Sequence, residues 1–276
     1  IFDHHDITPE NYVAKYGKKG LLFKILHLME KATFRTANIV ISTNESYKKI
    51  ATSVRGSKRI NDVYVVRNGP DLRKLPNVKP NPELRNGFKY LLGYVGVIGQ
   101  QENIDNLLDI MSYIVNVRKR EDIKCIIVGS GPSWQDVVDL SKRMKLEKFV
   151  EFTGFIPEEK MYEVLCSADI CLNPEFNNEF TDKSTMIKIM EYMAFGKPVI
   201  QHNSTEGRYS ARESSLYIMN NDPRMFGDAI ISLLEDSQKR KKMGVAGKRR
   251  IEEELCWEKQ IINLHGAYNR VLTKAN

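Results

Sequence analysis

The sequence predicts an α/β protein built around a doubly wound parallel sheet. Between residues 88 and 236, apolar segments typical of buried strands alternate five times with amphipathic segments typical of helices, which is the pattern of a parallel sheet covered on both faces. The chain has 276 residues, of which 42% are hydrophobic and 28% charged, so it is long enough for one large or two ordinary domains. It contains no apolar run near the roughly 20 residues that cross a bilayer.

The segment 168–200 carries the strongest local signals. ADICLNP is a short apolar strand closed by a proline, and MIKIMEYMAF spaces its apolar residues along one face of a helix. Lys188 and Glu191 are three positions apart on the other face, one turn into that helix. Ser184 and Thr185 are predicted to cap its first turn. Because such a helix presents free N–H groups after the carboxyl end of a parallel strand, we expect an anion site here.

The helix and the turn after it, KIMEYMAFGKPVI, resemble the donor-binding signature of glycosyltransferase family 4, a family of retaining enzymes with the GT-B fold. Together with the preceding DKST, the stretch resembles the branch of that family that builds bacterial cell-surface polysaccharides. The resemblance covers essentially the whole chain. It implies two Rossmann-like domains and transfer of a sugar, with retention, from a nucleoside-diphosphate sugar to a growing glycan of lipopolysaccharide, capsule or exopolysaccharide. The acceptor would be a glycan or a lipid-linked glycan.

The resemblance also implies roles for individual residues. Glu191 matches the glutamate that holds the ribose hydroxyls, while Lys188 and the helix start at Ser184 and Thr185 would hold the phosphates. Lys188 would further stabilise the charge that develops on the leaving phosphate. Other donor contacts are implied at three positions, namely Gly96 near the phosphates and Phe155 and Ile156 near the base.

The chain departs from the broader family pattern at the donor sugar. Many members carry a second glutamate separated from the Glu191 equivalent by seven residues, and that position is Lys183 here. Its contact must be replaced or lost, and Asp182, Lys183 and Lys188 are the candidates for the donor sugar.

A second departure lies in the loop after the strand at 88–99. Most relatives place an Arg and a Lys there against the diphosphate, whereas this chain has Val97 and Glu102. Backbone N–H groups, the helix dipole and Lys188 are therefore expected to bind the diphosphate. The sequence contains no Asp-x-Asp, so we expect neither a metal-bridged diphosphate nor any cofactor.

Two adjacent histidines follow the first strand. By the resemblance, a histidine at this place faces the cleft between the domains, and His5 is preferred for a donor contact and a catalytic role, with His4 as the alternative. A metal site formed with Asp3 and Asp6 is the other interpretation. It is disfavoured because adjacent residues of an extended segment point to opposite sides.

Charge is unevenly distributed along the chain. Residues 1–87 contain 16 Lys and Arg against 8 Asp and Glu, whereas the remainder contains 26 against 27. The basic first portion predicts an anionic partner, and nucleic acid is not expected because no recognised binding motif is present. The amphipathic helix at 20–36 has two interpretations, a helix packed on its own sheet or one that rests on anionic lipid. The second would place a cytoplasmic enzyme peripherally on the inner face of the plasma membrane.

The resemblance divides the chain into four parts. These are the last part of an N-terminal acceptor domain (1–72), a linker (73–87), a C-terminal donor domain (88–255) and a terminal helix returning toward the acceptor domain (256–276). The acceptor domain would lack its first strands, so the sequence is interpreted as N-terminally truncated.

Two further expectations concern chemistry. The four cysteines lie in apolar segments without metal-ligand spacing, and we interpret them as reduced core residues. The alternative to an enzyme is a non-catalytic GT-B-like protein that binds a nucleotide or a glycan as a partner subunit. Lys183, Val97 and Glu102 favour that alternative.

Overall fold

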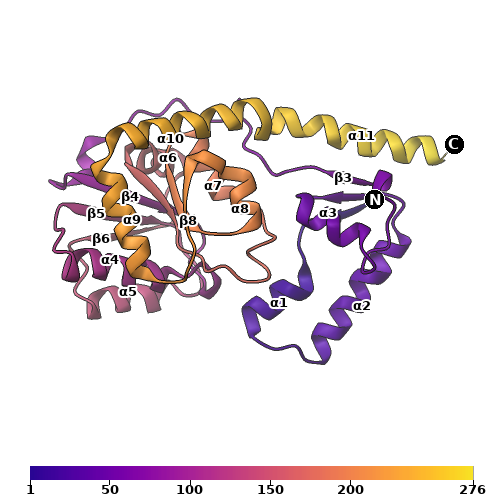
Figure 1. Ribbon diagram of the computed structural model, residues 1–276, viewed down its shortest axis with the longest axis horizontal. Coiled ribbons are helices and arrows are strands. Elements are labelled where there is room, and N and C mark those ends of the chain that lie inside the picture. Colours follow the sequence, from indigo (N-terminus) through magenta and orange to yellow (C-terminus); the bar gives the residue numbers. More distant parts are fainter. Residues whose placement is uncertain (276) are drawn as a thin grey trace.

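The computed structural model, which describes residues 1–275, contains a large and a small parallel sheet (Figure 1). The large sheet has the strand order β6-β5-β4-β7-β8-β9, and every neighbouring pair in it is parallel. The predicted α/β fold class is therefore confirmed. Its strands are β4 (Tyr90–Val95), β5 (Ile123–Val128), β6 (Val150–Gly154), β7 (Ile170–Asn173), β8 (Val199–His202) and β9 (Ser215–Ile218).

Helices cover both faces of the large sheet. The alternation of side chains along a strand explains why both faces are apolar: Cys125 and Ile127 of β5 point into one buried cluster, and Ile126 and Val128 into the other. Helices α4, α5 and α9 pack on the first face, and α6, α7 and α8 on the second. The bounds are α4 (Ile104–Ser112), α5 (Trp134–Arg143), α6 (Glu158–Ser167), α7 (Ile187–Ala194), α8 (Thr205–Ala211), α9 (Pro223–Glu235) and α10 (Ser237–Arg250).

The order in which the chain adds strands to the sheet reverses between β4 and β7, although all strands stay parallel. From β4 the chain adds β5 and then β6 on one side, and β7, β8 and β9 follow on the other. The loops after β4 and β7 therefore leave the sheet in opposite directions. In open α/β sheets, the carboxyl ends of the strands at such a reversal border a crevice where ligands bind.

The small sheet has the order β1-β2-β3 and is also parallel. One of its faces packs on Phe34 of α2 and Ala51 of α3. The other face, which includes Ile39 and Ile41, packs on Ala267 of the long last helix, which crosses over from the large sheet (Figure 1). The elements are β1 (Phe2–His4), α1 (Thr8–Tyr16), α2 (Leu21–Thr36), β2 (Val40–Ser42), α3 (Glu45–Thr52), β3 (Val63–Val65) and α11 (Trp257–Ala275).

Helix α2 turns its apolar stripe outward. Leu21, Leu28 and Met29 are 75%, 68% and 60% exposed, whereas Glu30 and Phe34 are buried. Glu30 is drawn inward because Arg55 bonds to its carboxylate and to that of Glu10. Helix α2 thus packs on its own sheet, which is one of the two interpretations of 20–36, but it does so through Phe34 and not through the predicted apolar stripe. No helix within residues 1–275 has the length and apolar character needed to cross a membrane.

We call the small sheet with α1, α2 and α3 the small unit, and the large sheet with its covering helices the large unit. A buried ion pair joins the two units. Nη1 of Arg67, just after β3, lies 3.0 Å from Oε2 of Glu206 in α8, and both side chains are 3% exposed. The other oxygen of Glu206 accepts hydrogen bonds from the backbone and hydroxyl of Ser46 at 3.2 and 2.7 Å. Arg208, two residues further along α8, bonds to Asn203 and takes no part in this contact. The two units are thus joined through Glu206.

Replacing Arg67 by Met is predicted to destabilise the chain by about 3–5 kcal/mol, because the Glu206 carboxylate would remain buried without its counter-ion. The double variant Arg67→Met/Glu206→Gln should recover most of that loss, since no charge is then left buried. Urea denaturation measures both effects. Arg208→Met, on the exposed side of α8, is the matched control. A loss for Arg67→Met below about 1 kcal/mol, the range of an exposed pair, would contradict the prediction.

Candidate active site

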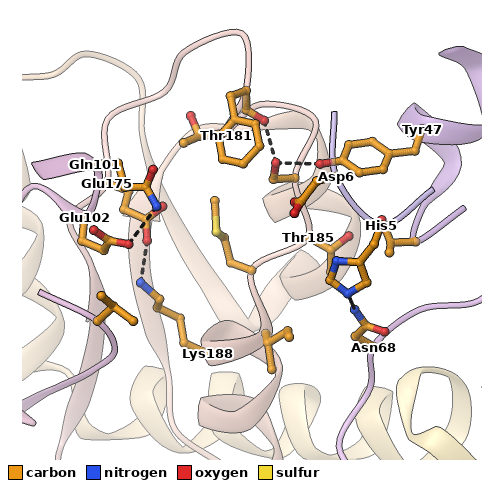
Figure 2. Close-up of a pocket in the computed structure, with 16 residues that line it drawn as sticks. His5, Asp6, Tyr47, Asn68, Gln101, Glu102, Glu175, Thr181, Thr185 and Lys188 are labelled. Atoms are coloured by element: carbon orange, nitrogen blue, oxygen red, sulfur yellow. Dashed lines mark hydrogen bonds and ion pairs between the residues drawn. The ribbon is translucent and has the colours of Figure 1, made fainter. Parts of the chain in front are cut away.

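A cavity of about 260 Å³ lies where the crevice of the large sheet meets the small unit. Figure 2 shows Lys188 and Glu175 on one side of it and His5 and Tyr47 on the other. The lining residues come from the loops after β1, β2, β3, β4 and β7 and from the first turns of α3 and α7: His5, Asp6, Thr43, Tyr47, Asn68, Val97, Gln101, Glu102, Glu175, Phe180, Thr181, Ser184, Thr185, Met186, Ile187 and Lys188.

Lys188 is held between a carboxylate and a phenol. Its Nζ lies 2.5 Å from Oε1 of Glu175 and donates to the hydroxyl of Tyr94 at 3.3 Å. Burial alone would lower the pKa of Lys188, but the Glu175 carboxylate and the Tyr94 hydroxyl together raise it above its ordinary value. Gly96 lies directly beneath, because a Cβ there would be 2.7 Å from the Tyr94 oxygen and 3.3 Å from Nζ. The lysine is therefore cationic and fixed in place.

Helix α7 begins later than the sequence suggested. Its N-cap is Met186, so Ser184 and Thr185 do not cap it. Both side chains are instead used by the small unit: the Ser184 hydroxyl is 3.1 Å from the Tyr47 hydroxyl, and the Thr185 hydroxyl accepts from Asn44 at 3.1 Å. The Ser184 N–H also has an acceptor, the Thr181 carbonyl. The predicted cap is therefore wrong, and the open N–H groups at this end belong to the first turn of α7.

His4 and His5 point to opposite sides, as expected for adjacent residues of an extended segment. His5 lines the cavity, and its Nε2 lies 2.7 Å from the amide nitrogen of Asn68. His4 is fully buried against Phe34 and Tyr47, and burial lowers its pKa to about 4. Between residues 1 and 275 no group of three or more His, Cys, Asp or Glu side chains is arranged to hold a metal ion.

The two positions that replace the Arg–Lys pair of most relatives both reach the cavity. Val97 is 57% exposed and offers only apolar surface. Glu102 turns back onto its own loop, where it accepts from the Gly99 N–H at 3.1 Å and from the Gln101 amide at 3.1 Å. Neither residue supplies positive charge to the cavity.

The candidates for the donor sugar, Asp182 and Lys183, lie outside the cavity lining. Asp182 accepts hydrogen bonds from the N–H and hydroxyl of Thr205 at 2.8 and 3.0 Å, so it fixes the start of α8. Lys183 pairs with Glu179 at 3.4 Å. Both residues lie in the loop that connects β7 to α7, and both side chains are engaged in these contacts.

The residues proposed for the ribose and the base also lie outside this cavity. Glu191 of α7 is half-buried. Burial raises the pKa of its carboxyl group, and the neighbouring Glu158 carboxylate raises it further. Phe155, in the loop after β6, is 90% exposed, and Ile156 is half-buried. The sites predicted for phosphate and for ribose are thus separated by one turn of α7.

Glu175 and Tyr94 are two residues of the site that were not predicted from the sequence. A signal for Glu175 was present, because it directly follows the proline that closes a buried strand, and the carboxyl ends of strands at a sheet reversal border the crevice. Tyr94 gave no such signal, since it is part of an apolar strand and only its hydroxyl reaches the site.

These groups have a definite chemical capacity. A fixed ammonium, open N–H groups at a helix start and a neighbouring carboxylate can bind an anion on one side and hydroxyl groups on the other. Because the ammonium and the N–H groups are positioned before any ligand arrives, these donors could stabilise charge that develops on a phosphate without moving themselves.

Comparison with known proteins identifies relatives that are named as glycosyltransferases. The family model described as "Glycosyl transferases group 1" matches residues 89–236. An uncharacterized glycosyltransferase of Methanocaldococcus jannaschii is 20% identical over 88% of this chain and 61% of its own length. The capsular polysaccharide biosynthesis glycosyltransferase CapM of Staphylococcus aureus is 25% identical over 93% of this chain and 68% of its own length.

Solved structures show the same fold. Sucrose-phosphate synthase from Thermosynechococcus elongatus aligns with a TM-score of 0.80 and 19% identity, covering 99% of this chain and 67% of that one. Anabaena HepE, in complex with UDP and glucose, aligns with a TM-score of 0.77 and 17% identity, covering 97% and 70%.

The chain spans about three fifths of the M. jannaschii relative's length. The family model nevertheless matches more than half of the chain, including β4, β7 and the whole of α7. The chain therefore belongs to the glycosyl transferases of group 1, with a GT-B type of fold.

Proposed function

We propose that this protein transfers a sugar, with retention of configuration, from a nucleoside-diphosphate sugar to a growing cell-surface glycan. Its donor domain would comprise 88–255 and its acceptor side the small unit. CapM acts in capsular polysaccharide biosynthesis, and HepE has been crystallised with UDP and glucose. These two relatives support the proposed acceptor and donor classes.

One observation carries the proposal. The ammonium of Lys188 and the first turn of α7 meet at the sheet reversal, and His5 of the small unit faces them across the cavity. A diphosphate on the helix start would have its sugar directed toward the small unit. Donor and acceptor held together in this way gain a positioning effect that lowers the barrier by several kcal/mol.

In the proposed reaction, the chain's own groups stabilise the leaving diphosphate. Lys188 and the N–H groups of α7 would balance its growing negative charge, and His5 would contact the donor sugar. We propose that no metal or other cofactor takes part, in line with the missing Asp-x-Asp.

The alternative is a non-catalytic nucleotide- or glycan-binding subunit. It is favoured by the carboxylate of Glu102 and the apolar Val97 in the loop after β4. A thermal-shift screen against UDP, GDP, ADP, dTDP and their sugars, followed by transfer assays with the full-length protein, separates the two. Transfer from any donor supports the enzyme; tight nucleotide binding without transfer across the panel supports the subunit.

Lys188→Ala should weaken binding of UDP by about 1.5–3 kcal/mol, because a charge-assisted hydrogen bond to phosphate is lost. Uridine, which has no phosphate, should bind almost unchanged. Isothermal titration of both ligands checks this expectation. Equal losses for UDP and uridine would exclude a role of Lys188 at the phosphates.

Glu191→Ala should weaken nucleotide binding by about 1–3 kcal/mol, because two ribose hydroxyls lose a charged acceptor. The loss should be as large for uridine as for UDP, opposite to the pattern for Lys188. Glu159→Ala, an exposed carboxylate on α6, is the control. Unchanged affinity of the Glu191 variant would place the ribose elsewhere.

We further propose that α2 rests on an anionic membrane at the cytoplasmic face. Its outward apolar stripe lies among exposed basic side chains, and this combination suits the interface of an anionic bilayer. The exposed basic side chains are those of Lys15, Lys18, Lys24 and Arg35.

The chain is therefore expected to bind vesicles of phosphatidylglycerol more weakly as salt rises, because exposed charges are screened beyond about 8–10 Å. Lys24→Glu/Arg35→Glu should reduce binding in a sedimentation assay. The same charge change on α10, Lys239→Glu/Lys241→Glu, should matter much less. Salt-insensitive binding, or equal effects of the two double variants, would argue against a docking role of α2.

A further inference from the structure

The cavity contains more negative than positive charge. Among its lining residues, Asp6, Glu102 and Glu175 are carboxylates, and Lys188 is the one lysine or arginine. A diphosphate is itself an anion and would be repelled by an excess of carboxylates. Its binding therefore depends on where each carboxylate is directed.

The three carboxylates differ in their surroundings. Asp6 is exposed to solvent, and Glu102 is engaged by the Gly99 N–H and the Gln101 amide. The Glu175 side chain is only 7% exposed, and Lys188 is the partner that the structure gives it. Glu175 thus takes the place beside Lys188 that a phosphate oxygen would need.

Any movement of Glu175 away from Lys188 would have to come from its side chain. The backbone is tied on both sides, since the Pro174 carbonyl accepts from Asn106 at 3.0 Å and the Phe176 N–H donates to Asn103 at 3.0 Å. Lys188 is held independently by Tyr94. An arriving phosphate would therefore meet a stationary ammonium and a displaceable carboxylate.

We propose that Glu175 is a specificity-determining residue that pairs with Lys188 until a donor binds, yields it to the donor diphosphate, and then accepts hydrogen bonds from the hydroxyl groups of the donor sugar. The inference rests on the proposed function. It assigns to Glu175 the sugar contact for which Asp182 and Lys183 are engaged elsewhere.

This arrangement distinguishes the donor from the product. The terminal phosphate of a free nucleoside diphosphate carries roughly −1.5 to −2 charges near neutral pH, whereas in the donor that phosphate is esterified to the sugar and carries a single charge. The free diphosphate therefore places its extra charge opposite Glu175. The donor places neutral hydroxyl groups there, so Glu175 favours the donor and assists release of the product.

The test compares UDP and UDP-glucose, with GDP and GDP-mannose as a second pair, by isothermal titration of the 276-residue chain. For Glu175→Gln, we expect the diphosphate to bind about 3–10-fold more tightly and the nucleotide sugar about 3–10-fold more weakly, the effects of removing one repulsion and one charged acceptor. Loss of structure would weaken both ligands alike, so opposite changes cannot come from it.

Two further variants complete the test. Glu179→Gln makes the same change in the same loop but outside this cavity, and it should leave the affinity ratio of the two ligands unchanged. Glu175→Gln/Lys188→Met leaves no charge of the pair buried; both affinities should fall, but the ratio should still shift toward the diphosphate.

The outcomes distinguish failure of this inference from failure of the proposed function. Binding by the wild-type chain with an unchanged ratio in Glu175→Gln rejects the inference and leaves the proposed function standing. No binding of either ligand pair by the wild-type chain rejects both. A ratio shifted toward the diphosphate in the Glu175 variants, but not in Glu179→Gln, supports the assignment.

Discussion

The constraint on which this molecule depends is that the carboxyl ends of parallel strands lie at the same edge of a sheet. All six strands of the large sheet deliver their carboxyl ends to one edge, and the reversal between β4 and β7 opens that edge where two loops diverge. Gly96 and Glu175 leave the sheet on either side of the reversal, and Lys188 reaches between them from α7. Residues far apart in the sequence thus form one site because the topology allows no other place for them.

The small sheet is also parallel and covered on both faces, but one of its covering helices comes from the far end of the chain. A three-stranded sheet has two faces to cover, and its own helices cover only one. Helix α11 covers the other with Ala267, which is fully buried, and with the larger side chains of Trp257, Leu264 and Val271 around it. The last helix is therefore part of the small unit's core although it follows the large sheet in sequence. The relative placement of the two units, and with it the cavity, depends on this helix and on the buried contacts of Glu206.

The fold could be predicted from the sequence because it rests on periodicity. Alternating strands and helices gave the doubly wound sheet, and the extended geometry at His4 and His5 gave opposite directions for the two side chains. The site was harder to predict, because its details depend on competition between partners. Ser184 and Thr185 have the chemistry of capping residues, but their hydroxyls are bonded to Tyr47 and Asn44 of the small unit, and α7 starts at Ile187. Likewise, the stripe on α2 has the spacing of a buried face, yet Arg55 draws Glu30 inward instead. Such outcomes depend on tertiary contacts that local spacing does not encode.

The two buried ion pairs beside the cavity obey the same electrostatics and have different consequences. Arg67 and Glu206 are each 3% exposed and belong to different units, so no ligand can reach either charge without separating the units. Lys188 and Glu175 belong to one unit and face the cavity, where an arriving anion can replace the carboxylate without leaving a charge unpaired. The cost that makes a buried pair resist disruption is therefore removed when the ligand itself supplies the replacement charge. Access to the cavity, more than the strength of either pair, determines which one holds the fold together and which one can exchange its partner.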